Sequence, residues 1–71
     1  MTLKKINPSQ LKIIEELERN PKLSQWELSQ KIGINDRNVR RNMRLLRLMG
    51  IVRRIGPNHK DGHWEIIREN L

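Results

Sequence analysis

The chain has 71 residues, of which 15 are lysine or arginine and 8 are aspartate or glutamate, and its formal net charge of +7 favours a polyanionic partner. Its length predicts a single domain over residues 1–71 without a deep catalytic cleft, and the lack of cysteine excludes disulfides and thiolate catalysis. No apolar run is long enough for a membrane span or a signal peptide, so we expect a cytoplasmic location and no membrane partner.

The first predicted helix spans residues 8–19. Asn7 has the side chain favoured at an N-cap, Pro8 suits the first helical position, and Gln10 can complete a capping box. A residue before a proline avoids helical angles, so we expect the helix to end before Pro21. The apolar stripe expected to face the core consists of Leu11, Ile14 and Leu17.

A second helix is predicted over residues 25–32. Ser24 and Glu27 form another capping-box pair, and Gly33 suits the left-handed position that ends a helix. Only Gly33 and Ile34 lie between this helix and Asn35, the N-cap of the next. A break this short favours two helices that cross at a steep angle, as in a helix–turn–helix.

The third predicted helix spans residues 36–49. Asn35 is its N-cap, Asp36 lies at the positive end of the helix dipole, and Gly50 suits its C-terminal end. Apolar residues at four- and seven-residue spacing predict one buried stripe, made of Val39, Met43 and Leu46.

Burial of that stripe predicts which side chains of the third helix face solvent. Successive residues turn by about 100° around a helix, so three arginines lie nearly opposite Val39 and two polar residues flank them. The stretch 37–60 carries eight basic residues and no acid, so the domain is polarised in charge. The outward arginines are Arg37, Arg41 and Arg44, and the flanking residues are Asn38 and Arg40.

An arginine-rich helix face of this kind suits the DNA major groove, where arginine pairs with guanine and asparagine pairs with adenine. We therefore expect base contacts from this face, including one from Asn38. Side chains toward the groove walls are better placed for phosphates, and these are Arg40, Arg44 and Arg47. The exposed backbone amides at the start of the second and third helices can also donate hydrogen bonds to phosphates.

Beyond the third helix, β-branched and aromatic runs predict strands over residues 51–55 and 63–67, joined by a turn over 56–62. Residues 22–24 are a candidate for a short third strand beside them. The expected order is helix, short strand, helix, helix, strand, strand.

The predicted hairpin, or wing, is also basic. Arg53 and Arg54 point to opposite faces of its first strand, and His59 and Lys60 lie near its tip. A hairpin tip beside a recognition helix can reach the adjacent minor groove or its phosphates. Lys60 is the stronger candidate, because histidine is largely neutral near pH 7.

The segment from Leu23 to Ile67 resembles the bacterial and archaeal winged helix–turn–helix superfamily. The run LSQWELSQKIGINDRNVRRNM resembles its two-helix core. The ending GIVRRIGPNHKDGHWEI is similar to the C-terminal winged-helix domains of Fic-type proteins and of helicase-like transcriptional regulators. Ser29 and Trp26 depart from the family, which usually has alanine and a polar residue there. The resemblance implies a small α+β fold in which three helices pack with a β-hairpin wing.

Charge pattern and resemblance together predict a module that binds double-stranded DNA, in a prokaryotic transcriptional regulator, with no cofactor and no enzymatic activity. The alternative is a protein-interaction or adaptor domain of a larger multidomain protein, for example a Fic-type protein whose chemistry lies elsewhere. A homodimer and additional domains of a longer chain both stay open.

Four large apolar side chains have two interpretations each. Trp26 falls near the exposed side of the second helix, where it either packs partly against the first helix or the N-terminal segment, or contacts another domain or subunit. Leu45 and Leu48 lie away from Val39, and they either bury under the wing or the C-terminal residues or form a dimer or interdomain surface. Trp64 is expected to pack against the third helix rather than to stack on a base.

Catalytic and metal chemistry find no support in the sequence. No nucleophile–base constellation or glycine-rich phosphate loop is present. His59, Asp61 and His63 are close in sequence, but a zinc site usually needs three or four well-placed ligands, so we expect no metal.

Overall fold

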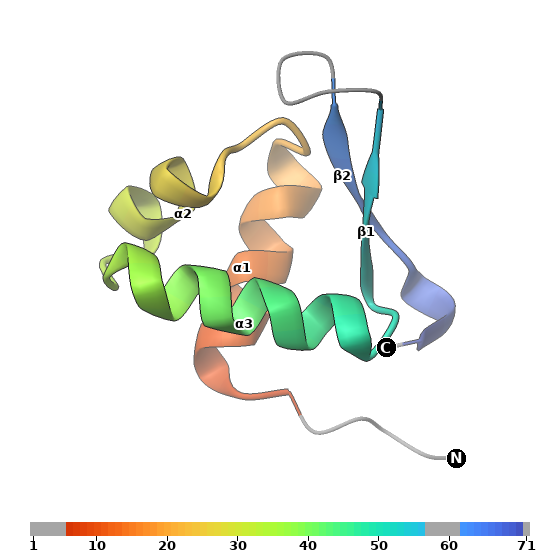
Figure 1. The fold of residues 1–71 in the computed structure, drawn as a ribbon, viewed down its shortest axis with the longest axis horizontal. Coiled ribbons are helices and arrows are strands. Elements are labelled where there is room, and N and C mark those ends of the chain that lie inside the picture. Colours follow the sequence, from red (N-terminus) through yellow and green to blue (C-terminus); the bar gives the residue numbers. More distant parts are fainter. Residues whose placement is uncertain (1–5, 57–61, 71) are drawn as a thin grey trace.

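A computed structural model describes residues 6–56 and 62–70 of the chain. Within these ranges, three α-helices are followed by an antiparallel hairpin and a short 3-10 helix, which is the predicted small α+β fold (Figure 1). The elements are α1 (Pro8–Arg19), α2 (Gln25–Ile32), α3 (Asp36–Leu48), β1 (Val52–Ile55), β2 (His63–Ile66) and η1 (Arg68–Asn70).

The first two helices begin at the predicted capping boxes. At α1, the Gln10 amide donates to Asn7 Oδ1 over 2.7 Å, and the Asn7 amide donates to Gln10 Oε1 over 3.2 Å. At α2, Ser24 and Glu27 make the same reciprocal pair, with distances of 3.0 and 2.9 Å. These bonds satisfy backbone donors that the first turn of a helix leaves without partners.

Helix α3 begins at Asn35, whose side chain accepts from the Asn38 amide over 2.8 Å. It ends at Leu48, one residue before the predicted end. Gly50 takes a positive φ of 74° and donates to the Arg47 carbonyl, while the Ile51 amide donates to the Leu46 carbonyl. This crossed pair of bonds is a Schellman ending, which turns the chain directly into β1.

The core lies between the three helices and the hairpin, and it confirms the predicted stripe of α3. The prediction for α1 was wrong at one position, because Leu11 is 51% exposed, and Ile13 is buried as well as Ile14 and Leu17. Gln10 takes the buried position one turn before Ile14, since hydrogen bonds satisfy its amide. The buried apolar residues are Ile13, Ile14, Leu17, Leu23, Leu28, Val39, Met43, Leu46, Ile51, Val52 and Trp64.

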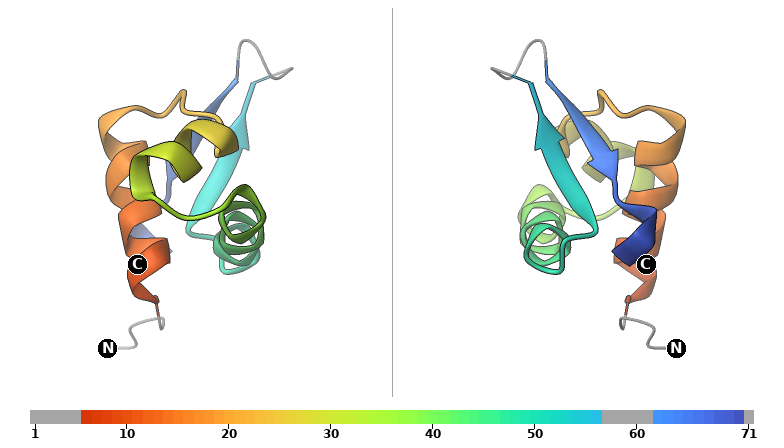
Figure 2. Two further views of the ribbon diagram at one scale, coloured as in Figure 1. Left: turned by 90° about the vertical axis from the view of Figure 1, so that its left-hand side faces the viewer. Right: turned by 90° about the vertical axis from the view of Figure 1, so that its right-hand side faces the viewer.

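The three helices and the hairpin surround this core from different sides. In Figure 1, α3 crosses in front of α1, α2 lies beside it, and the hairpin stands at the C-terminal end of α3. The side views in Figure 2 show α3 and α1 on opposite flanks of the molecule with the hairpin between them, β1 toward α3 and β2 toward α1. One side of α3 therefore faces solvent next to β1.

The hairpin strands are each one residue shorter than predicted, and β1 pairs with β2 in the register Val52↔Ile66 to Ile55↔His63. The expected strand over residues 22–24 is absent from the described part of the chain. Pro21 and Lys22 form a turn instead, and one backbone bond of 2.7 Å joins the Trp64 amide to the Pro21 carbonyl. Proline has no amide hydrogen, so it cannot make the second bond of a strand pair at that position.

The C-terminal segment, residues 67–70, contacts both flanks of the molecule. Asn70 Nδ2 donates to the Gly50 carbonyl over 2.6 Å, and the Ile67 amide donates to the Ile51 carbonyl over 2.7 Å. Arg68 pairs with Glu18 of α1 at 2.5 Å. Residues 67–70 therefore hold the turn after α3 from behind.

Glycine substitutions test the contact between Asn70 and the turn after α3. Gly33→Ala and Gly50→Ala each place a side chain at positive φ, which costs about 1–2 kcal/mol. A Cβ at Gly33 meets open space, whereas one at Gly50 lies 3.0 Å from Asn70 Nδ2. We expect Gly50→Ala to lower the free energy of unfolding more than Gly33→Ala in equilibrium urea denaturation. Equal losses would show that Asn70 does not constrain the turn.

Candidate nucleic-acid interface

The outward face of α3 is formed by arginine side chains. Val39, Met43 and Leu46 are completely buried, and this fixes the rotation of the helix about its axis. At about 100° per residue, the positions opposite this stripe point to solvent. The exposed arginines at those positions are Arg37, Arg41 and Arg44, as the sequence predicted.

Carboxylates of the same chain neutralise the flanks of this surface but not its centre. Arg40 pairs with Asp36 one turn earlier, with an Nη2–Oδ2 distance of 2.8 Å. Arg53 on β1 pairs with Glu65, its cross-strand partner on β2. In the described parts of the chain, no carboxylate pairs with the three central arginines, Arg37, Arg41 and Arg44. Their charge is therefore available to an anionic partner.

Trp64 of β2 joins the wing to α3. Its side chain is 7% exposed, and the guanidinium carbons of Arg54 and Arg47 lie 5.0 and 6.0 Å from its ring centroid. These are cation–π distances, so the ring orients one arginine from β1 and one from α3. Within residues 6–56 and 62–70, the buried Nε1 finds no hydrogen-bond partner. As expected from the sequence, the tryptophan is a packing residue.

A basic depression lies between α3 and β1. It has a volume of about 600 Å³, and four of its six lining residues are arginines from these two elements. Leu48 and Val52 complete its wall. We call this the four-arginine depression, and its arginines are Arg44, Arg47, Arg53 and Arg54.

A second depression, of about 420 Å³, lies at the start of α2. Arg47 and Arg54 line it together with Trp64, and Lys22 adds a further cation from the turn before α2. The remaining wall is the segment from Leu23 to Gln25, at the positive end of the helix dipole. Lys22 was not among the predicted site residues, and only the return of β2 to Pro21 brings it here.

Asn42 is another residue that the sequence analysis missed. Its Oδ1 accepts from Gln10 Nε2 over 3.2 Å and from Asn7 Nδ2 over 3.4 Å, and its Nδ2 donates to the Asn38 carbonyl over 2.9 Å. Gln10 is only 4% exposed. This network fixes the start of α1 against the middle of α3, and asparagine at an interhelical position was its only sequence signal.

The remaining predicted residues divide into two groups. Asn38 is exposed beside the central arginines, and Arg53 and Arg54 face opposite sides of β1, toward Glu65 and Trp64 respectively. His59 and Lys60 lie outside the described residues.

The exposed apolar side chains test one of the open interpretations. Leu45 and Leu48 do not bury under the wing or the C-terminal residues, because both are exposed, Leu48 by 75%. Trp26 is 63% exposed, as expected for a residue near the exposed side of α2. All three side chains are therefore accessible on the surface.

A known protein family matches most of this chain. The profile of the winged helix-turn-helix DNA-binding family matches residues 6–53. The chain belongs to this family. The match spans all three helices and the first half of β1, and it gives the winged helix–turn–helix domain a DNA-binding role. Searches of curated proteins and of solved structures found no significant match.

The described ranges of this winged helix–turn–helix domain contain neither a cluster of metal ligands nor a membrane-spanning helix. Over residues 6–56 and 62–70, no three histidine or acidic side chains come together as metal ligands. No helix in the same ranges combines the length and the apolar character that a membrane crossing requires.

The Gln10–Asn42 contact can be tested by stability. Gln10→Ala removes two hydrogen bonds and leaves Asn42 with a weaker partner, so we expect a loss of about 1–2 kcal/mol in the free energy of unfolding. Leu11→Ala is the matched control, because this neighbour is exposed and its truncation costs less than about 0.5 kcal/mol. Equilibrium urea unfolding measures both, and a control that loses as much as Gln10→Ala would contradict the network.

Proposed function

We propose that this winged helix–turn–helix domain is the sequence-specific reader of a prokaryotic transcriptional regulator and that α3 enters the major groove of double-stranded DNA. The observation that carries the proposal is the outward face of α3, where three guanidinium groups have no carboxylate partner within the described residues. Three like charges on one helix face repel one another, and phosphates or guanine edges relieve that repulsion.

Each side of the interface has a distinct role in this proposal. Arg37 and Arg41 lie opposite the buried stripe and approach guanine edges, and Asn38 approaches adenine beside them. Arg44 and Arg47 approach phosphates from the four-arginine depression. Arg40 also contacts a phosphate, since an exposed pair such as its bridge to Asp36 is worth only about 0–1 kcal/mol and exchanges readily.

The wing contacts the backbone or the minor groove next to α3. Arg54 is held over Trp64, so little side-chain freedom is lost when it meets a phosphate. Arg53 exchanges its salt bridge to Glu65 for a contact with a phosphate. His59 and Lys60 contribute further contacts to the DNA. The depression at the start of α2, with Lys22, receives a further phosphate.

An arginine and a lysine on opposite flanks test the choice of recognition face. We expect Arg41→Ala to weaken binding to a duplex selected from a random pool by about 1–3 kcal/mol, because a bidentate guanine contact is lost. Lys12→Ala removes the same charge from an exposed position of α1, and we expect it to change binding much less. Fluorescence anisotropy titrations compare the two, and equal losses would contradict this orientation.

Salt dependence separates phosphate contacts from base contacts. The logarithm of the affinity falls linearly with the logarithm of the salt concentration, and each phosphate contact contributes about 0.9 to the slope. We expect Arg44→Gln to reduce the slope by about one and to weaken binding to all sequences alike, while Lys12→Gln leaves the slope unchanged. An unchanged slope for Arg44→Gln would remove this arginine from the phosphate contacts.

The exposed Trp26 and Leu48 favour a second candidate function. Large apolar side chains at the surface mark protein contacts, as in an adaptor domain of a multidomain protein of the Fic type or in a homodimer. An adaptor would show no binding to random duplex DNA even at low salt, which is the condition that most favours DNA binding.

A further inference from the structure

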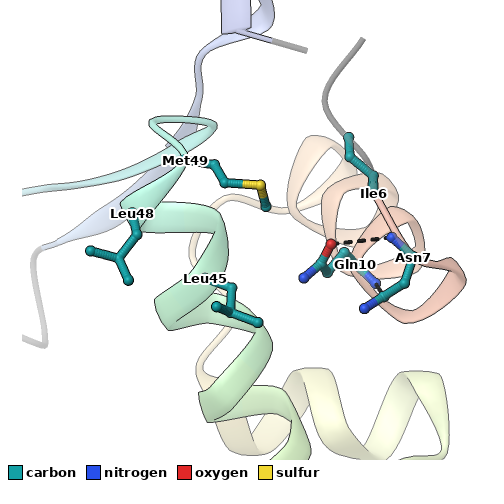
Figure 3. Close-up of a pocket in the computed structure, with 6 residues that line it drawn as sticks. All are labelled: Ile6, Asn7, Gln10, Leu45, Leu48 and Met49. Carbon is teal, nitrogen blue, oxygen red and sulfur yellow. Dashed lines mark hydrogen bonds between the residues drawn. The ribbon is translucent and has the colours of Figure 1, made fainter.

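An apolar groove lies beside the arginine face, between the start of α1 and the C-terminal half of α3. It has a volume of about 580 Å³. In Figure 3, Leu45 and Met49 extend toward Ile6 and Gln10, and Leu48 lies at the outer edge. We call it the Leu45 groove, and its lining residues are Ile6, Asn7, Gln10, Leu45, Leu48 and Met49.

Leu48 belongs to two concave surfaces at once. It lines the Leu45 groove on one side and the four-arginine depression on the other. An apolar hollow and a cationic hollow therefore adjoin across one side chain, which is 75% exposed. Arg44 stands one turn before Leu48 and extends the positive charge along the same ridge.

This juxtaposition restricts what can occupy the surface. DNA can use the arginines but has little apolar surface for the groove. A second copy of the chain can fill the groove with its own leucines, but two arginine faces would then approach each other and repel. A helix that carries apolar residues on one stripe and carboxylates beside it matches both hollows.

We propose that the Leu45 groove and the four-arginine depression together dock an acidic amphipathic helix of a partner protein. Its apolar side chains, spaced by one and two turns, enter the groove beside Leu45 and Met49. Its carboxylates lie across Leu48 and pair with Arg44 and Arg47, which have no carboxylate partner in the described chain.

Such a partner competes with DNA, and this part of the proposal rests on the proposed function. Arg44 and Arg47 cannot neutralise a phosphate and a carboxylate at the same place. The partner therefore acts as a regulator that removes the domain from DNA. Docking itself depends only on the groove and its neighbouring charges, so it can be tested without DNA.

The experiment selects ligands for the full chain from a displayed library of random peptides of about 15 residues, which allows four helical turns. We expect the enriched peptides to carry two or three large apolar residues at helical spacing and an excess of aspartate and glutamate next to them. The most enriched peptide is then synthesised, labelled, and titrated with the chain by fluorescence anisotropy.

Two leucine variants of matched chemistry locate the binding site. Leu48→Gln should lower the affinity for the peptide by about tenfold, because the complex loses the burial of one leucine side chain. Leu11→Gln changes another exposed leucine, on α1, and should leave the affinity within about twofold. Both positions are exposed, so the variants fold, and circular dichroism confirms it. Arg44→Gln should weaken the peptide too, most strongly at low salt.

Several results would overturn the proposal. Enriched peptides that lack acidic residues would show that the two hollows do not act together. The same conclusion would follow if the peptide bound the Leu48→Gln variant as tightly as the wild-type chain. If the chain forms a dimer in sedimentation and Leu48→Gln dissociates it, the occupant is a second copy. If removal of residues 1–5 raises the affinity by more than about tenfold, the occupant is this chain's own N-terminal segment.

Competition has a separate readout. The enriched peptide should displace a labelled duplex from the wild-type chain, while Leu11→Gln behaves as wild type. Duplex that stays bound at saturating peptide would refute the regulatory part alone. Failure of the chain to bind any duplex would refute the proposed function, and peptide binding would still decide docking.

Discussion

Burial of one stripe of α3 determines the remaining properties of the surface. Val39, Met43 and Leu46 are completely removed from solvent, and their withdrawal from water stabilises only one rotation of the helix. In that rotation Arg37, Arg41 and Arg44 point outward. The position of the charged groups thus follows from the packing of apolar ones, and the arginines themselves need no internal partners to be held in place.

Trp64 has a comparable role for the wing. It is the one aromatic residue of the buried core, and it lies under guanidinium groups from both α3 and β1. Packing of one ring therefore fixes the distance between α3 and the hairpin. This contact helps to form the four-arginine depression, because the Trp64 ring holds Arg47 of α3 and Arg54 of β1 close to each other. The same depression adjoins the apolar groove at Leu48, so the surface that we propose for DNA overlaps the one that we propose for an acidic helix.

Much of the fold was predictable because the helix ends depend on interactions between residues close in sequence. Capping boxes at Asn7 and Ser24 and the glycine ends of α2 and α3 depend on residues a few positions apart, and all were placed to within one residue. The buried stripe and the outward arginines followed from periodicity alone. The error at Leu11 arose where periodicity was ambiguous, since a satisfied Gln10 could take the buried position that an apolar residue was expected to fill.

What the sequence by itself determined is therefore the ends of the three helices, the buried stripe of α3 and the two strands of the hairpin, for which neighbouring residues supply the free energy. Only the tertiary structure decided which faces meet. The Asn42 network, the bridge between Arg53 and Glu65, the approach of Lys22 to Trp64 and the junction at Leu48 all join residues that are distant in the chain. Their geometry depends on how helices and hairpin pack around one core, and no local pattern encodes that arrangement.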